Sequence, residues 1–346
     1  MEYKQIYGIK KRVSAICLGT MTFGEQNSIK ESHEIMDYAY SQGVNFFDTA
    51  EMYPIPPSGQ TYNQTESIIG KWNKIKTNRD KIIIASKVIG PSREMSYIRD
   101  GDHKLNKKNM TQALNGSLKR LNTDYIDLYQ IHWPERTTNF FGRLGFEKNE
   151  DIEINSIAET LEVLHSFIQE GKIKAIGISN ETPWGLMQYL KWSDKLNLTK
   201  ISTIQNPYNL LNRTFEVGLS EMSMRENVGL LAYSPLGFGT LSGKYIENKS
   251  SPSSRLNKWP SYLRYSSPQS IKAIEKYLEI SKRFNISLTQ LALSFVNNRD
   301  FISSTIIGAT NLKQLEENIE SINLALPDEI IFEINPTDRK AKAKIP

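Results

Sequence analysis

Short apolar runs recur along the chain of 346 residues, and most of them precede a longer segment with apolar residues at helical spacing. Alternating strands and helices are typical of a parallel sheet. Stripes such as Leu114, Leu118 and Leu121 repeat at i, i+4 and i+7 and are predicted to be core. The apolar runs predict eight strands, over 15–18, 44–47, 82–85, 126–131, 173–178, 201–204, 229–232 and 305–307.

Eight strand–helix units over this length favour one closed α/β barrel over an open doubly wound sheet. No Pro/Gly/Ser-rich linker divides the chain. We therefore predict a single (β/α)8 TIM barrel domain over residues 1–346, with its core at about 13–335 and a polar tail over 336–346. The segment Tyr3 to Val13, with a turn near Gly8, is predicted to be an N-terminal hairpin that closes the bottom of the barrel.

Three predicted connections are longer than ordinary strand-to-helix loops. They follow strands 3, 4 and 7, over 88–106, 133–155 and 236–268. Loops of this length in a compact domain are usually functional.

Composition narrows the class of protein. Hydrophobic residues make up 39% and charged residues 23% of the chain, and it holds only 20 glycines and 14 prolines, which excludes collagen-like and disordered sequences. The net charge of +5 is spread over the whole chain, so we expect no nucleic-acid partner. The one cysteine, Cys17, lies in an apolar run, and no segment has the length and apolarity of a membrane helix or a signal-peptide core. We expect a protein of the reducing cytoplasm with no membrane association.

Polar residues stand where the predicted strands end. In a parallel barrel these ends meet on one face, where catalytic residues sit. Tyr53 follows the end of the second strand closely, so the pattern places Asp48, Tyr53, Lys87 and His132 around one pocket. The polar strand ends are Asp48, Lys87, His132, Ser179 with Asn180, Gln205, and Tyr233 with Ser234.

This set of side chains suits proton transfer. The four histidines show no metal-ligand spacing, so we expect no metal site. An ammonium at ~4 Å supplies about 4 kcal/mol at an effective dielectric near 20, enough to lower the pKa of Tyr53 by roughly two to three units. Asp48 would hold the Lys87 ammonium and keep it charged, and His132 would orient a substrate oxygen. The set could deliver a proton to a carbonyl oxygen while another species attacks the carbon.

Side chains do not donate hydride, so a cofactor would supply it. The polar groups of Ser179, Asn180 and Gln205 could hydrogen-bond a carboxamide, and Tyr233 could stack on a flat ring. Residues 308–311 precede the last predicted helix, whose first amides favour phosphate. The glycines over 237–243 lack the spacing and position of a dinucleotide fingerprint, so no Rossmann domain is predicted.

Several strings resemble the aldo-keto reductase superfamily from about Tyr3 to Ile334. They are Asp48 to Tyr53, Ser86-Lys87, Ser117 to His132, Gly177 to Asn180 and Gln314 to Asn318, with further similarity at Gly19 to Asn27, Gln205 to Tyr208 and Leu236 to Thr240.

The resemblance implies a barrel that binds NADP(H) without a Rossmann fold, with Asp48, Tyr53, Lys87 and His132 as the catalytic tetrad. It also implies cofactor contacts from Gly19, Thr20, Met21, Asp48, Ser179, Asn180, Gln205, Tyr233, Ser234, Pro235, Leu236, Gly243, Lys244, Arg255, Gly308, Thr310, Gln314, Glu317 and Asn318. Lys244, Arg255 and Gln314 are expected to converge on a 2′-phosphate.

The substrate pocket is expected to contain Tyr53, His132 and Trp133, with an apolar wall from Trp133, Phe140 and Phe141. The tail after the last helix is short and polar, unlike the long specificity loop of steroid- and aldose-reducing members of the superfamily. Other loops must therefore shape the pocket.

The expected activity is NADPH-dependent reduction of a small aldehyde or ketone, with Tyr53 as proton donor. One alternative is a cofactor-sensing regulatory subunit, because the superfamily includes potassium-channel β subunits that keep the tetrad. A barrel isomerase with a Lys87 Schiff base is disfavoured, because Asp48 would keep the amine protonated. The oligomeric state stays open.

Overall fold

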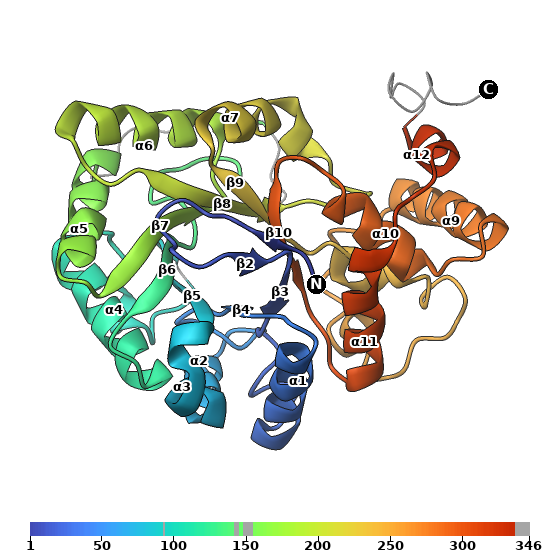
Figure 1. Cartoon of the computed structure of the whole chain (residues 1–346), viewed down its shortest axis with the longest axis horizontal. Coiled ribbons are helices and arrows are strands. Elements are labelled where there is room, and N and C mark those ends of the chain that lie inside the picture. The colour runs from blue at the N-terminus through green and yellow to red at the C-terminus, as the bar shows by residue number, and fades with distance from the viewer. Residues whose placement is uncertain (93, 142–144, 148–154, 336–346) are drawn as a thin grey trace.

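The computed structural model describes residues 1–92, 94–141, 145–147 and 155–335. Eight parallel strands form a closed barrel in the order β10-β3-β4-β5-β6-β7-β8-β9, and helices surround it (Figure 1). This confirms the predicted (β/α)8 barrel. The barrel strands are β3 (Ile16–Gly19), β4 (Phe46–Asp48), β5 (Ile83–Val88), β6 (Ile126–Ile131), β7 (Ile173–Ser179), β8 (Ile201–Pro207), β9 (Gly229–Tyr233) and β10 (Ile302–Ile307).

Several helices begin at a residue whose side chain caps the first turn. Ser28 and Ser156 each form a capping box with the glutamate three residues later, Glu31 and Glu159. The helices are α1 (Ile29–Ser41), α2 (Gln64–Lys71), α3 (Asn73–Asn78), α4 (Lys107–Leu121), α5 (Ile157–Gln169), α6 (Pro183–Leu196), α7 (Leu219–Glu226), α8 (Arg255–Lys258), α9 (Pro268–Arg283), α10 (Leu288–Asn297), α11 (Leu312–Glu320) and α12 (Asp328–Ile334).

The strand boundaries differ from the expected ones by a few residues. The second barrel strand begins at Phe46 and not at Val44, and the last begins at Ile302 and not at Thr305. Helical stripes are core as predicted, since Leu114 and Leu121 are fully buried and Leu118 packs against them at the edge.

The N-terminal segment closes one end of the barrel. Its strands β1 (Tyr3–Lys4) and β2 (Val13–Ser14) pair antiparallel, and the segment crosses the middle of the barrel in Figure 1. Ile6, Ile9 and Val13 belong to the same buried cluster as residues inside the barrel, such as Phe46 and Leu128. The predicted hairpin therefore plugs the barrel, because its apolar side chains fill the space that the strands leave open at that end.

The register of the strands brings the polar strand ends to the opposite end. Gly19 pairs with Asp48, and Asp48 pairs with Ala85. Lys87 lies two residues beyond Ala85 and so points to the same side of the sheet. Asp48 and Lys87 therefore both face into the barrel at its C-terminal end.

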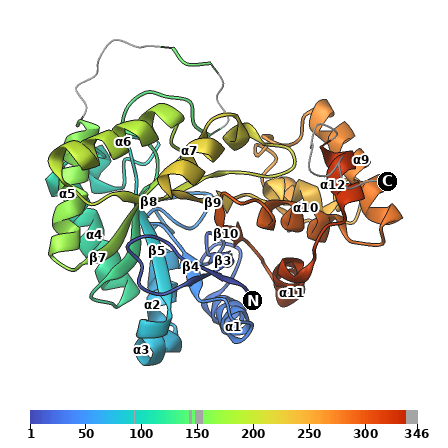
Figure 2. The same ribbon diagram turned by 45° about the horizontal axis from the view of Figure 1, so that its top comes forward.

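The long connections follow β5, β6 and β9, the third, fourth and seventh strands of the barrel. The one after β9 contains a 3-10 turn, η4 (Gly237–Ser242), and the short helix α8. Parts of the one after β6, and the predicted tail over 336–346, lie outside the described residues. The helices α9 and α12 lie side by side at the edge of the barrel in both views (Figures 1 and 2). Within the described ranges, no helix has the length and apolarity needed to cross a membrane.

Candidate active site

A buried ion pair lies at the C-terminal end of the barrel. The Lys87 Nζ is 2.6 Å from Asp48 Oδ1 and donates to the Thr49 carbonyl at 2.8 Å. Burial acts to lower the pKa of Lys87, but the nearby Asp48 carboxylate and Tyr53 outweigh it and raise that pKa above its ordinary value. The ammonium is therefore held charged inside the barrel.

The second oxygen of Asp48 accepts two side-chain amides. Gln205 Nε2 donates to Asp48 Oδ2 at 2.9 Å, and Gln130 Nε2 donates to it at 3.2 Å. Sequence reasoning missed Gln130. Its position two residues before His132 on an apolar strand was a usable signal, because alternate residues of a strand share a face. The two amides fix the carboxylate so that its other oxygen faces Lys87.

Tyr53 lies beside this pair in the loop after β4. The Lys87 Nζ is 5.0 Å from the centre of the Tyr53 ring, and the ring is partly exposed. Burial raises the pKa of Tyr53 above its ordinary value, and Lys87 is the strongest influence that opposes this rise. The sequence-based expectation of a lowered pKa is thus wrong for this structure. Removing the phenolate from water costs more free energy than its attraction to the Lys87 ammonium supplies.

His132 completes the expected tetrad. Its ring centre is 5.7 Å from that of Tyr53, and the residue is 7% exposed. Burial, followed by the Lys87 charge, holds the pKa of His132 well below its usual range, so the imidazole is neutral at pH 7. Its Nδ1 is buried and has no hydrogen-bond partner among the residues described.

Aromatic side chains extend outward from His132. The Trp133 ring is 4.9 Å from the His132 ring, and the Phe141 ring is 5.7 Å from Trp133. Phe140 packs edge-on against Phe141 at 5.1 Å. Trp133 is buried and donates from Nε1 to the Pro91 carbonyl, whereas Phe141 is 42% exposed. The expected apolar wall therefore runs from the tetrad towards the surface.

The residues expected to hold a carboxamide are bonded mainly to one another. Asn180 Nδ2 donates to the His132 carbonyl at 2.9 Å, and Asn180 Oδ1 accepts the Tyr233 hydroxyl at 2.6 Å. Ser179 Oγ donates to the Gln205 carbonyl at 2.7 Å. Asn180 and Gln205 are also buried, at 5% and 3% exposure, although both stand where the sequence predicts strand ends. Asn180 is thus bonded to His132, and Gln205 to Asp48.

The residues expected at the phosphates surround the start of α11. An added Cβ on Gly308 would meet no atom within 4 Å, so the backbone there faces open space. Gln314 Oε1 accepts from the Thr310 amide at 3.1 Å, and Asn318 Nδ2 donates to the Gly308 carbonyl at 3.2 Å. Glu317 instead accepts the Ser287 hydroxyl at 2.6 Å, so its carboxylate is engaged with the start of α10.

Lys244 and Arg255 lie close together in the connection after β9. Burial, and then the Arg255 charge, lowers the pKa of Lys244. Arg255 lies over the Phe238 ring at 5.6 Å. Among the described residues neither cation has an ion-pair partner. The expected third member of this group, Gln314, is engaged with Thr310 instead.

The remaining expected contacts line the barrel mouth. The Thr20 hydroxyl donates to the Asp48 carbonyl at 2.8 Å, and the Met21 carbonyl accepts from the Ile55 amide at 2.9 Å. A Cβ on Gly19 would lie 2.7 Å from Ile306 Cγ2, so the strand tolerates only glycine there without repacking. Ser234, Pro235 and Leu236 form the turn that follows β9, and Gly243 ends η4 in a left-handed conformation.

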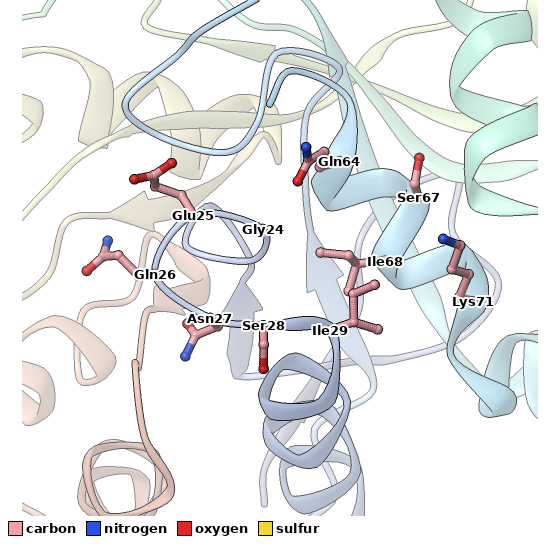
Figure 3. A pocket seen from close by; sticks show the side chains of 10 residues that line it. All are labelled: Gly24, Glu25, Gln26, Asn27, Ser28, Ile29, Gln64, Ser67, Ile68 and Lys71. Carbon is pink, nitrogen blue, oxygen red and sulfur yellow. The ribbon is translucent and has the colours of Figure 1, made fainter. Parts of the chain in front are cut away.

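A separate cavity of about 360 Å³ lies between the β3–α1 loop and α2 (Figure 3). Figure 3 shows Gln64, Ser67 and Lys71 on one side and the loop with Glu25 and Gln26 on the other. None of its ten lining residues belongs to the tetrad; they are Gly24, Glu25, Gln26, Asn27, Ser28, Ile29, Gln64, Ser67, Ile68 and Lys71.

Comparisons with known proteins show what the chain is similar to. The chain is 48% identical to Protein tas of Escherichia coli (strain K12) over 96% of each chain. It is 32% identical to the uncharacterized oxidoreductase YrpG of Bacillus subtilis (strain 168), over 97% of this chain and 95% of that one. It is 28% identical to norsolorinic acid reductase B of Dothistroma septosporum, over 96% and 81%.

The names of these relatives indicate an oxidoreductase and give the channel-subunit alternative no support. The family model described as "Aldo/keto reductase family" matches residues 15–338. With this match and the barrel site above, the chain belongs to the aldo/keto reductase family.

Proposed function

We propose that this protein reduces an aldehyde or ketone, with NADPH as the hydride source and Tyr53 as the proton donor. The observation that carries the proposal is the buried Lys87–Asp48 pair at 2.6 Å, which lies beneath Tyr53 and beside a neutral His132. The Lys87 ammonium next to the protonated phenol of Tyr53 and the neutral imidazole of His132 is an arrangement that can deliver a proton to a carbonyl oxygen.

Each tetrad residue has a distinct part in this proposal. The neutral imidazole of His132 hydrogen-bonds the substrate oxygen and orients it. Tyr53 gives its phenolic proton to that oxygen as negative charge develops there. Lys87 stabilises the phenolate that Tyr53 leaves, and Asp48 holds Lys87 in position. The raised pKa of Tyr53 keeps the phenol protonated before reaction, so the donor is loaded at neutral pH.

The mouth of the barrel fits a nicotinamide cofactor, which would supply the hydride. The open backbone at Gly308 and the first amides of α11 suit a phosphate. Tyr233 and Asn180 stand next to His132 and would position a flat ring. Thr20 and Gly19 line the same mouth beside Asp48.

Lys244 and Arg255 favour NADPH over NADH. Lys244 and Arg255 are both partly buried, and burial followed by the neighbouring Arg255 charge lowers the pKa of Lys244. A 2′-phosphate between them would neutralise both charges and accept their hydrogen bonds. Charge-assisted contacts of this kind contribute roughly 1.5–3 kcal/mol each, which is enough for a strong preference.

The test is NADPH oxidation with a panel of simple aldehydes and ketones, for the wild type and for Tyr53→Phe. This substitution removes only the hydroxyl, so NADPH affinity should stay within about threefold while turnover falls roughly 10²- to 10⁴-fold. Lys87→Met should be similarly impaired, and the double variant little worse than either single one, because the two residues act as one unit. The matched control is Tyr38→Phe on α1, which should retain full activity.

Turnover of Tyr53→Phe within threefold of the wild type would assign the proton to another donor, with His132 as the next candidate. Tight NADPH binding by the wild type without turnover of any carbonyl in the panel would overturn the proposed reductase and favour a regulatory role.

A further inference from the structure

Arg264 lies in the long connection after β9 and reaches across the mouth of the barrel. Its guanidinium is 5.3 Å from the Phe238 ring and 5.9 Å from the ring of Phe141, which comes from the connection after β6. It also interacts with the Tyr233 hydroxyl. Arg264 is only partly exposed, so three aromatic side chains from two loops and one strand hold its charged group in place.

The charge of Arg264 has no carboxylate partner among the residues that the structure describes. Several other partly buried arginines do have one: Arg79 pairs with Asp127, Arg99 with Glu51, Arg120 with Glu66, and Arg136 with Glu181. Arg255, which is proposed above to bind a phosphate, lacks one as well. A guanidinium that is fixed, partly desolvated and unpaired is a preorganised site for an anion.

The place of this guanidinium relative to the tetrad indicates which anion it would meet. A row of aromatic rings leads from Tyr53 through His132 and Trp133 to Phe141, with neighbouring ring centres 4.9–5.7 Å apart. Arg264 lies at the outer end of this row. Arg264 also contacts Tyr233, which Asn180 joins to His132. A molecule whose carbonyl lies at Tyr53 and whose apolar body lies against these rings would therefore have its far end near Arg264.

We propose that Arg264 determines substrate specificity by binding a carboxylate on the far end of an aldehyde or ketone that has an apolar body. This rests on the proposed reductase function. The planar guanidinium has five N–H donors, so it can hold both carboxylate oxygens at once beside its contact with Tyr233. The carboxylate takes no part in the bond changes, since the hydride still goes to the carbonyl carbon and the Tyr53 proton to its oxygen.

The experiment compares two aldehydes that differ in one charge, 4-carboxybenzaldehyde and its methyl ester, methyl 4-formylbenzoate. Wild type, Arg264→Gln and Arg264→Lys are assayed at saturating NADPH. The matched control is Arg225→Gln, an exposed arginine on α7. For 4-carboxybenzaldehyde, Arg264→Gln should lower kcat/KM roughly 10- to 100-fold, mostly through KM, and Arg264→Lys should restore part of the loss. For the ester, all variants should stay within about threefold of the wild type.

Two results would overturn the proposal. An equal loss of kcat/KM for the acid and the ester would mean that Arg264 supports the loop and does not bind the carboxylate. A more than threefold weaker NADPH affinity in Arg264→Gln, measured by fluorescence titration, would assign the guanidinium to the cofactor.

A binding measurement separates this proposal from the reductase function. If the wild type reduces neither aldehyde, the proposed function fails, and titration with terephthalate still tests Arg264. Tighter binding of terephthalate to the wild type than to Arg264→Gln would support the carboxylate site, and equal binding would refute it.

Discussion

The protonation states of three side chains decide what the site can do at neutral pH. The pKa values of Tyr53 and Lys87 are raised and that of His132 is lowered. Burial raises the pKa of Tyr53 and lowers that of His132. At Lys87 burial also acts to lower the pKa, but the Asp48 carboxylate and Tyr53 outweigh it. The free protein therefore holds a protonated phenol, an ammonium and a neutral imidazole together.

These directions predict a flat pH profile. A raised pKa keeps the Tyr53 phenol and the Lys87 ammonium protonated up to about pH 10 or beyond, and a lowered one keeps His132 neutral from well below pH 6.5 upward. We expect kcat/KM for 4-nitrobenzaldehyde to vary less than threefold between about pH 6.5 and 9.5. Initial rates in overlapping buffers of constant ionic strength check this. A break between pH 7 and 8 would instead mean that Lys87 lowers the pKa of Tyr53, as the sequence alone predicts.

At the scale of elements, the N-terminal hairpin is one part of the chain that departs from the strand–helix repeat. It closes the barrel end opposite the tetrad. Ile6 and Ile9, at 2% and 3% exposure, pack into the barrel interior, whereas their neighbour Tyr7 is 57% exposed. The hairpin should therefore stabilise the fold through two side chains.

Truncating these side chains tests that role. Ile6→Ala and Ile9→Ala should each lower the free energy of unfolding by about 2–5 kcal/mol, because each leaves a cavity in a closed interior. Tyr7→Ala serves as the control from the same segment and should change it by less than about 0.5 kcal/mol. Urea unfolding followed by circular dichroism gives the three values. If both isoleucine variants lose less than about 1 kcal/mol of unfolding free energy, the hairpin does not contribute to the core of the barrel.

At the scale of the whole molecule, loops from opposite ends of the sequence build one mouth. Asn27 Nδ2, from the loop after β3, donates to the Thr310 carbonyl before α11 at 3.0 Å. Lys258 of α8 reaches Glu25 of the same early loop at 3.3 Å. The proposed cofactor site is thus closed by contacts between the first, seventh and eighth strand–helix connections.

Cofactor preference is the property that depends on this assembled mouth. NADPH should bind at least tenfold more tightly than NADH, and Arg255→Ala should reduce this preference while leaving NADH affinity within about threefold. Arg283→Ala, on α9 away from the mouth, is the matched control. Titrations of protein fluorescence with each cofactor give the dissociation constants. Equal affinities for the two cofactors in the wild type would refute the assignment of Lys244 and Arg255 to a 2′-phosphate.

The sequence by itself determined the barrel and the type of site. Strand–helix alternation is a local pattern, and parallel strands must bring their ends to one face, so Asp48, Lys87 and His132 could be placed together without coordinates. Apolar periodicity marks which residues turn inward, and this holds wherever in the fold the element lies. The same local reasoning found the hairpin between Tyr3 and Val13.

The partners of these residues were decided only by the tertiary structure. Gln205 donates to Asp48 across 157 positions of the chain, and Asn180 joins the His132 carbonyl to the Tyr233 hydroxyl. No local pattern reports which of several polar groups will meet inside a closed barrel. The direction of the Tyr53 pKa shift was likewise beyond the sequence, because the cost of desolvation depends on everything packed around the ring. The contacts of Arg264 with Phe238 and Phe141 were also decided by the tertiary structure, because these rings come from two different loops.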